Sequence, residues 1–397
     1  MSIELTPRTE PGRRLVAIAE SLAEEIRPAA AAHDRDGTFP FESLAAVRAS
    51  GYLTAPVPAR LGGLGVESVH DLVVAASRLA RGDAALTIGT SMHRVYVINL
   101  LRRWQEAEAA SNERRIDAFG RSLEQLARDG TVFAAAISEP AQDLTRPATR
   151  ATQTPEGWTI SGRKMFCTMS PAADTLYVAV TFDADGEERY GYAIVPTDTP
   201  GVVVHDDWDA LGMRASGSGS VSFEEARLPP GALRGGFPVG DTVEYIERNL
   251  DPGLFHAAAA LGAAEHAHAR ATDRNGREPD ARSRLVAAES EVELSACRAV
   301  LSRAAALLDE HFAPGWTADL TLLFAEAQAA KTFIGEAAVR IVDRALALSG
   351  GAGYLNGSPI ARAYRDVRAT AFMHPLGTNR AYDYLGGLAF GGVPALH

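Results

Sequence analysis

The chain has 397 residues, of which 46% are hydrophobic and 22% charged, as in an ordinary globular protein with a sizeable core. Its net charge of −11 argues against nucleic acid and an anionic membrane surface as partners. Two cysteines are too few for a disulfide framework. The first residues lack the apolar core of a signal peptide, and no run approaches the roughly 18 apolar residues of a membrane span. We therefore expect a cytoplasmic protein.

Helices are predicted for the N-terminal third of the chain, where apolar residues recur at helical spacing. A loop rich in proline and glycine, 51–65, interrupts them. The expected helices are 13–32, 41–50, 69–79, 84–104 and 116–128. These segments predict an N-terminal helical domain over residues 1–128.

Short apolar or β-branched runs then replace the helical pattern, and turn residues such as Asp185-Gly186 separate them. The expected strands are 132–137, 153–154, 158–161, 175–182, 190–195, 202–205 and 220–223. They predict a central domain over 129–235, built as a small antiparallel barrel or sandwich.

The remainder, 236–397, returns to helices that are long and rich in alanine, which suits a four-helix bundle. The expected helices are 254–272, 283–312, 317–349 and 378–390. Between the last two lie a glycine-rich loop, a short basic helix and the pair His374-Pro375. We place Pro375 in the first turn of the last helix, with His374 just outside it, where unpaired N–H groups can face an anion or an electron-rich ring.

Four stretches resemble the acyl-CoA dehydrogenase superfamily. They are the loop GGAGY at 350–354, the Arg365-Asp366 step, the strand GRKMFCT at 162–168 and the segment LGMRAS at 211–216. The resemblance implies an α+β fold with an N-terminal all-α domain, a central antiparallel β-barrel domain and a C-terminal four-helix bundle. It also implies a flavin cofactor.

His374 stands where this family keeps the glutamate that removes the α-proton of a thioester, counting from Arg365-Asp366. The segment Phe372-Met373-His374-Pro375 is similar instead to the flavin monooxygenases of the same fold, in which a histidine lies near the flavin. A histidine with an unperturbed pKa of about 6.5 can donate or accept a proton at neutral pH. We therefore expect a monooxygenase that uses reduced flavin and O2 on a small organic substrate.

Two other interpretations stay open at this point. The chain resembles an acyl-CoA dehydrogenase or desaturase whose base lies elsewhere, with Asp251 or Glu247 as candidates near the start of helix 254–272. An inactive flavin-binding paralogue would also lack the glutamate. His93, in an apolar helix expected to border the active site, is a further catalytic candidate.

The flavin contacts follow from the resemblance. An aromatic residue and a hydroxyl two positions apart share one face of a strand, so Phe166 can cover the ring while Thr168 bonds its edge. The close backbone approach expected at Gly351 predicts that a bulky residue there abolishes flavin binding. The residues assigned to the cofactor are Ser138, Phe166, Thr168, Arg214, Ser216, Gly350, Gly351, Gly353 and Thr378.

The resemblance implies FAD or FMN as the cofactor. The family's Arg-x-x-Phe-Gly, which reaches the adenine half of FAD, has no clean match at 271–284, and Ala347 replaces the usual glutamine before the glycine loop. No metal site is expected, because His266 and His268 are two apart on a helix and face different sides.

The expected partners are a small-molecule substrate, O2 and a flavin reductase that supplies reduced flavin. The alanine-rich helices 283–312 and 317–349 would leave an apolar face in a monomer, which predicts a homodimer or homotetramer.

Overall fold

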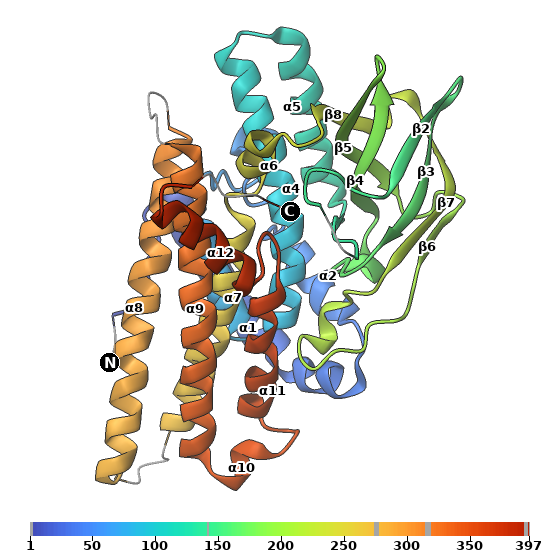
Figure 1. Cartoon of the computed structure of the whole chain (residues 1–397). Helices are drawn as coiled ribbons and strands as arrows, with labels where there is room; N and C mark the ends of the chain where they lie inside the picture. The colour runs from blue at the N-terminus through green and yellow to red at the C-terminus, as the bar shows by residue number, and fades with distance from the viewer. Residues whose placement is uncertain (1–2, 141–142, 274–277, 314–318, 393–395, 397) are drawn as a thin grey trace.

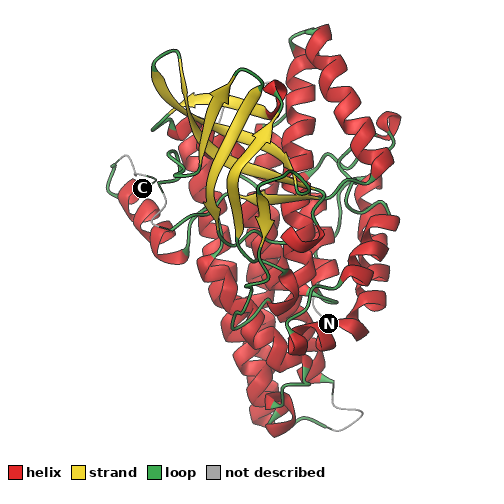
Figure 2. Ribbon diagram, turned by 90° about the vertical axis from the view of Figure 1, so that its right-hand side faces the viewer, coloured by secondary structure: helices red, strands yellow, loops and turns green. Residues whose placement is uncertain are grey.

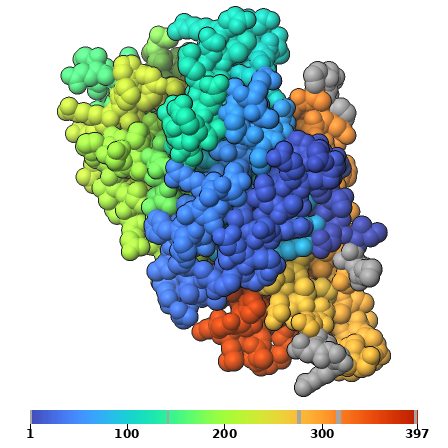
Figure 3. All heavy atoms as spheres, turned by 180° about the vertical axis from the view of Figure 1, so that it is seen from behind, coloured from blue at the N-terminus to red at the C-terminus, as the bar shows by residue number. Residues whose placement is uncertain are grey.

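The computed structural model describes residues 3–140, 143–273, 278–313, 319–392 and 396. A β-sheet lies beside one end of an elongated helical body (Figure 1). In Figure 2 the sheet faces the viewer, with helices beside and below it. On the opposite face the N-terminal helices lie between the sheet and the C-terminal helices (Figure 3). The predicted order of a helical, a strand and a helical unit is confirmed.

The N-terminal helices agree with the prediction, and their ends have physical reasons. The Thr9 hydroxyl caps the first helix by accepting from the Gly12 N–H, and Gly37 ends that helix in the left-handed region at φ 67°. The fourth helix runs past Trp104 because Trp104 and Ala107 are buried against the fifth. The helices are α1 (Glu10–Asp36), α2 (Phe41–Ala49), α3 (Val69–Ala80), α4 (Ala84–Ala109) and α5 (Glu113–Asp129).

The central unit is one eight-stranded sheet in the order β6-β7-β3-β2-β4-β5-β8, with β1 added beside β4. The prediction of a purely antiparallel sheet is wrong in one respect, because β1 and β2 each run parallel to β4. Strand β8 was not predicted, since its Gly235-Gly236 pair is atypical of a strand. The strands are β1 (Phe133–Ala136), β2 (Arg150–Thr154), β3 (Gly157–Lys164), β4 (Thr175–Ala184), β5 (Glu187–Pro196), β6 (Val202–Val204), β7 (Val221–Leu228) and β8 (Leu233–Pro238).

Helix α7 joins the two helical units, because it is buried along almost its whole length between α3 and α9. Small residues make this possible: a Cβ on Gly262 would lie 2.1 Å from the Ser77 carbonyl oxygen. The C-terminal helices are α6 (Thr242–Arg248), α7 (Pro252–Thr272), α8 (Ala281–His311), α9 (Leu320–Ser349), α10 (Gly351–Tyr354), α11 (Pro359–Asp366) and α12 (Thr378–Ala389), with the 3-10 segment η5 (Val367–Phe372) before α12.

The start of the last helix differs from the prediction. Helix α12 begins at Thr378 with Gly377 as its N-cap, so Pro375 lies in the preceding loop and not in the first turn. The ammonium group of Lys331 binds the carbonyl oxygens of Met373 and Leu376 in this loop, which keeps them out of a helical ladder. In the described part of the chain, no helix is long and apolar enough to cross a bilayer.

Candidate active site

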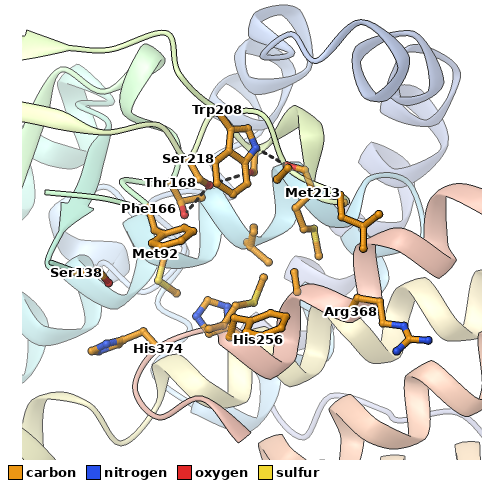
Figure 4. Close-up of a pocket in the computed structure, with 18 of the residues that line it drawn as sticks. Met92, Ser138, Phe166, Thr168, Trp208, Met213, Ser218, His256, Arg368 and His374 are labelled. Carbon is orange, nitrogen blue, oxygen red and sulfur yellow. Dashed lines mark hydrogen bonds between the residues drawn. The ribbon is translucent and has the colours of Figure 1, made fainter. Parts of the chain in front are cut away.

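A cavity of about 420 Å³ lies where α4, the loops below the sheet, α7 and the segment after α11 meet (Figure 4). Its size is typical of a site for a small ligand, and its walls are mainly apolar. Among the described residues, its lining contains no aspartate or glutamate. The residues that shape it include Ile88, Met92, Ala135, Ile137, Ser138, Phe166, Thr168, Trp208, Met213, Ser216, Ser218, His256, Arg365, Arg368, Phe372, Met373 and His374.

Three hydroxyl groups form a row on one wall. The Ser216 and Ser218 hydroxyl oxygens are 2.6 Å apart, and the Ser218 hydroxyl donates to Thr168 Oγ1 at 3.0 Å. Two backbone bonds hold this wall together: Cys167 N–H donates to Gly219 O and Met169 N–H donates to Ser216 O, both at 3.0 Å. The row offers polar atoms to one edge of a flat ligand.

Phe166 and Thr168 both line the cavity, but not through strand alternation as predicted. Strand β3 ends at Lys164, and Phe166 adopts φ 55° in a turn. A non-glycine residue in this left-handed region is uncommon and requires support from its surroundings. Met165 N–H donates to Ser138 O at 2.9 Å, which is part of that support. The turn leaves the Phe166 ring 59% exposed, edge-on to Trp208 with ring centroids 6.0 Å apart.

His374 lies at the margin of the cavity (Figure 4). Its ring is hydrogen-bonded to Asn249. Asn249 Nδ2 donates to Tyr245 O at 2.7 Å, so Oδ1 is the atom that faces His374 Nε2 at 2.6 Å. Oδ1 only accepts, which assigns the proton to Nε2 and leaves Nδ1 as an acceptor. Burial, followed by the charges of Lys331 and Arg380, lowers the pKa of His374 to about 3. The expectation of an unperturbed pKa is therefore wrong, and the imidazole stays neutral.

A second histidine, His256 on α7, also borders the cavity. Its ring stands among the lining side chains in Figure 4. The side chain is buried, its Nδ1 has no hydrogen-bond partner, and burial lowers its pKa well below the ordinary value. His256 lies in the apolar helix LFHAAAALG, whose sequence gives no sign that one face meets a cavity.

His93 and Asp251 are placed away from the cavity lining. His93 is fully buried, and its Nδ1 accepts from the Phe133 N–H at 3.0 Å, so it braces β1 against α4. The buried Asp251 carboxylate accepts from Arg102 at 3.2 Å. Glu247 faces His311 at 3.4 Å. The structure brings neither acid to the cavity, so neither is placed to act there as a base.

The remaining predicted contacts are also outside the lining. Arg214 Nε donates to Asp34 O at 2.8 Å, and Thr378 lines a separate groove beside α9. The glycine loop lies at the far end of α9 from the sheet (Figure 1). A Cβ on Gly351 would meet nothing within 4 Å, so the steric reason for its predicted effect is absent within one chain. The residues at this end are Gly350, Gly351 and Gly353, and their flavin role stays a prediction.

A flavin ring fits the observed lining. Phe166, Met92 and Trp208 offer apolar surface to its faces, and the hydroxyl row offers hydrogen bonds to its edge. Of the residues assigned to the cofactor, the structure brings Ser138, Phe166, Thr168 and Ser216 together around one cavity.

Replacing Thr168 by valine is expected to weaken flavin binding roughly five- to tenfold, because the shape is kept while one neutral hydrogen bond of about 1 kcal/mol is lost. Fluorescence titration of the purified protein with flavin measures the effect. Thr152→Val on the exposed side of β2 is the matched control and should bind like the wild type. Equal affinity of Thr168→Val and the wild type would remove Thr168 from the flavin site.

Residues 15–111, 134–226 and 248–380 match the family models of the N-terminal, middle and C-terminal domains of acyl-CoA dehydrogenase. The L-evernosamine nitrososynthase of Micromonospora sp. is 33% identical, over 97% of this chain and 92% of its own length. The amino sugar nitrososynthase RubN8 of Streptomyces rubradiris is also 33% identical, with the same coverage.

Solved structures give the same result. KijD3, in complex with FMN and dTDP-3-amino-2,3,6-trideoxy-4-keto-3-methyl-D-glucose, superposes with a TM-score of 0.88 at 32% identity, covering 97% of this chain and 95% of KijD3. FMN-bound TdsC from Paenibacillus sp. A11-2 shares the fold with a TM-score of 0.83 at 24% identity, covering 97% of this chain and 99% of TdsC. The protein is thus a flavin-dependent oxidoreductase that belongs to the acyl-CoA dehydrogenase superfamily.

Proposed function

We propose that the protein is a flavin-dependent monooxygenase that oxygenates the amino group of a nucleotide-linked amino sugar. The observation that carries the proposal is the absence of any carboxylate from the described cavity lining, together with a neutral histidine at the position of the family's base. The similarity to amino sugar nitrososynthases supports the choice of an amine.

The dehydrogenase alternative lacks its base. Removal of a thioester α-proton needs a carboxylate within reach of the substrate. Asp251 is held by Arg102, Glu247 faces His311, and neither lines the cavity. A histidine with a pKa of about 3 holds a proton too weakly to serve in the same role.

When bound, reduced flavin supplies two electrons to O2, so that one oxygen atom enters an N–O bond and the other leaves as water. The chain supplies the surroundings. Apolar walls exclude water, and the described lining holds no acidic side chain as a counter-charge to an ammonium ion, so the substrate amine is bound in its neutral, nucleophilic form. His374 Nδ1 accepts a hydrogen bond from that amine and orients it.

Arg368 is the cation available for a diphosphate at the rim. It is exposed, lines the cavity, and donates to the Tyr364 hydroxyl at 3.1 Å. Arg365, also in the lining, is engaged with Asp34. We take FMN as the flavin, because Ala347 and the segment 271–284 lack the family's contacts to the adenine half of FAD. Of that segment, 274–277 lie outside the described residues.

We further propose a homodimer or homotetramer supplied by a separate flavin reductase. Large apolar side chains on the outer faces of α8 and α9 are exposed, namely Leu285, Val292, Leu322 and Phe333. A second copy would cover them. Light scattering after size exclusion tests the assembly, and a clean monomer of about 42 kDa would contradict it.

The function is tested by incubating purified protein with reduced FMN, O2 and a dTDP-linked 3-amino sugar. The expected product carries oxygen on nitrogen, detected by mass spectrometry with ¹⁸O₂ as the source of label. An acyl-CoA should give no enoyl product and should not bleach bound oxidised flavin. If no product carries ¹⁸O and an acyl-CoA bleaches the bound flavin, the proposal is overturned in favour of a dehydrogenase.

A further inference from the structure

Lys331 is a buried cation beneath the cavity that the proposed chemistry does not use. It lies on α9, is 2% exposed, and forms no ion pair among the described residues. Its Nζ donates to two carbonyl oxygens, those of Met373 and Leu376, the latter at 2.6 Å. These two residues bracket His374 and Pro375, so a single amine holds both sides of the loop that carries His374.

Gly253 on α7 leaves the room that the lysine needs. A Cβ at this position would lie 3.3 Å from Lys331 Cδ, slightly tighter than ordinary contact, and 3.4 Å from Pro375 Cδ. The stem of Lys331 therefore passes beside the first turn of α7 to reach the loop. Helices α7 and α9 and the loop are fixed to one another at this point.

We propose that Lys331 is a positioning residue of the active site, which clamps the Met373 and Leu376 carbonyl groups and so sets the place of His374 at the cavity. The loop between η5 and α12 has neither a helical nor a sheet ladder. Buried carbonyl groups without donors are costly, and a charged donor makes the stronger hydrogen bonds. An apolar side chain of equal length would fill the space but leave both carbonyl groups free.

Among the described residues, no carboxylate lies within ion-pair distance of the Lys331 amine. Burial lowers the pKa of Lys331 to about 7. Both nearby histidines are neutral, since burial lowers their pKa values as well. His256 on α7 and His374 in the loop lie near the charge of Lys331. Glu336, Arg340 and Arg368 line the groove that Lys331 also borders.

The test is Lys331→Met in the full chain. Loss of the two hydrogen bonds from Nζ should open the loop at least about tenfold more often. The cleavage rate of a segment that opens transiently follows the fraction of molecules in which it is open. Chymotrypsin should therefore cut after Phe372, which is 84% exposed, at least about tenfold faster. Cleavage after Phe390, 96% exposed on the next helix end, serves as the internal reference and should not change.

The pH dependence of stability is a second test, because the direction of the change is predicted. The unfolded lysine has a pKa of about 10.4, so between about pH 7 and 10 the unfolded chain binds a proton that the folded chain does not. Wild-type stability therefore rises with pH across this window, and the methionine variant lacks that rise. The Tm of the variant minus the Tm of the wild type should therefore become more negative from about pH 6.5 to about pH 9.5.

Gln328→Met is the matched control. Gln328 lies one turn before Lys331, is fully buried, and has no hydrogen-bond partner for either amide atom among the described residues, so the substitution alters packing but removes no hydrogen bond to the loop. It should leave cleavage after Phe372 unchanged. In Lys331→Met, oxygenated product should fall roughly 10²-fold with little change in KM. Only this last readout rests on the proposed function; unchanged cleavage in Lys331→Met, or equal acceleration in Gln328→Met, would overturn the clamp by itself.

Discussion

Replacing His374 by alanine is expected to lower product formation by roughly 10²-fold or more while flavin binding is retained, because the loss of an orienting contact misplaces the substrate. Hydrogen peroxide release should rise in the same variant, since oxygen that is not transferred to substrate is lost to solvent. Product is measured by chromatography and peroxide by a coupled peroxidase assay, both against reduced flavin consumed.

The pH profile separates orientation from proton transfer in this variant. With a pKa of about 3, His374 does not titrate near neutrality, so the profiles of wild type and His374→Ala should have the same shape from about pH 6 to 8. Asn249→Leu is the companion variant, because it keeps the imidazole and removes the acceptor that assigns its proton to Nε2. It should show a smaller loss. Unchanged oxygenation and coupling in His374→Ala would make the residue structural.

Helices and turns were predicted well where they depend on residues that are close in the sequence. The hairpin at Asp185-Gly186 is an example: both residues have positive φ, 53° and 80°, as the turn between β4 and β5 requires. Helix α7 followed in the same way from a continuous apolar run bounded by Pro252. Such features depend on neighbours within a few residues, which the sequence displays directly.

The candidate site was harder to predict, because it is made of distant segments. Ser216 and Ser218 meet Thr168 across almost fifty residues of chain, and only the folded loop shows that they form one row. The resemblance pointed to His374, which the structure places in the cavity lining, whereas its pKa depends on burial and on Lys331, which no local pattern reveals. No local pattern places His256 at the cavity either.

The glycine loop shows the limit of a motif in one chain. Gly350 has φ 59° and ψ −153°, a conformation that glycine adopts far more readily than other residues, so the need for glycine there is real. Its distance from the cavity is set by the length of α9, which ends at Ser349. The glycine motif therefore shows which backbone conformation the loop needs, but it does not show where the loop lies relative to the cavity.

Replacing Glu139 by alanine is expected to be the most destabilising of the changes considered, by about 3–5 kcal/mol, because it leaves the buried Lys164 ammonium without its partner. The side chains of Lys164 and Glu139 are 0% and 3% exposed, and Nζ lies 2.6 Å from Oε1. Glu139 Oε1 also accepts from the Thr149 N–H at 2.7 Å. Thermal or urea unfolding, monitored by circular dichroism, measures the loss.

A double variant separates the effect of the two charges from the effect of the side-chain volumes. In Glu139→Gln with Lys164→Met both charges are gone while the volume is kept, so a large part of the lost stability should return. Burial raises the pKa of Glu139, but the charge of Lys164 and the hydrogen bonds from Thr149 and Ala148 outweigh it, so the net shift is downward. The pair's contribution is therefore present above the unfolded pKa of about 4.3 and is lost as pH falls through the lower folded value.

Glu139 also connects stability to the site, because it follows Ser138 directly and ties the end of β1 to the start of β2 and the end of β3. Flavin affinity of Glu139→Ala, measured well below its Tm, should therefore fall along with stability, whereas the double variant should recover both. If the alanine variant unfolds at the wild-type temperature, the ammonium of Lys164 must be hydrated, and the ion pair cannot be what holds Ser138 against the cavity.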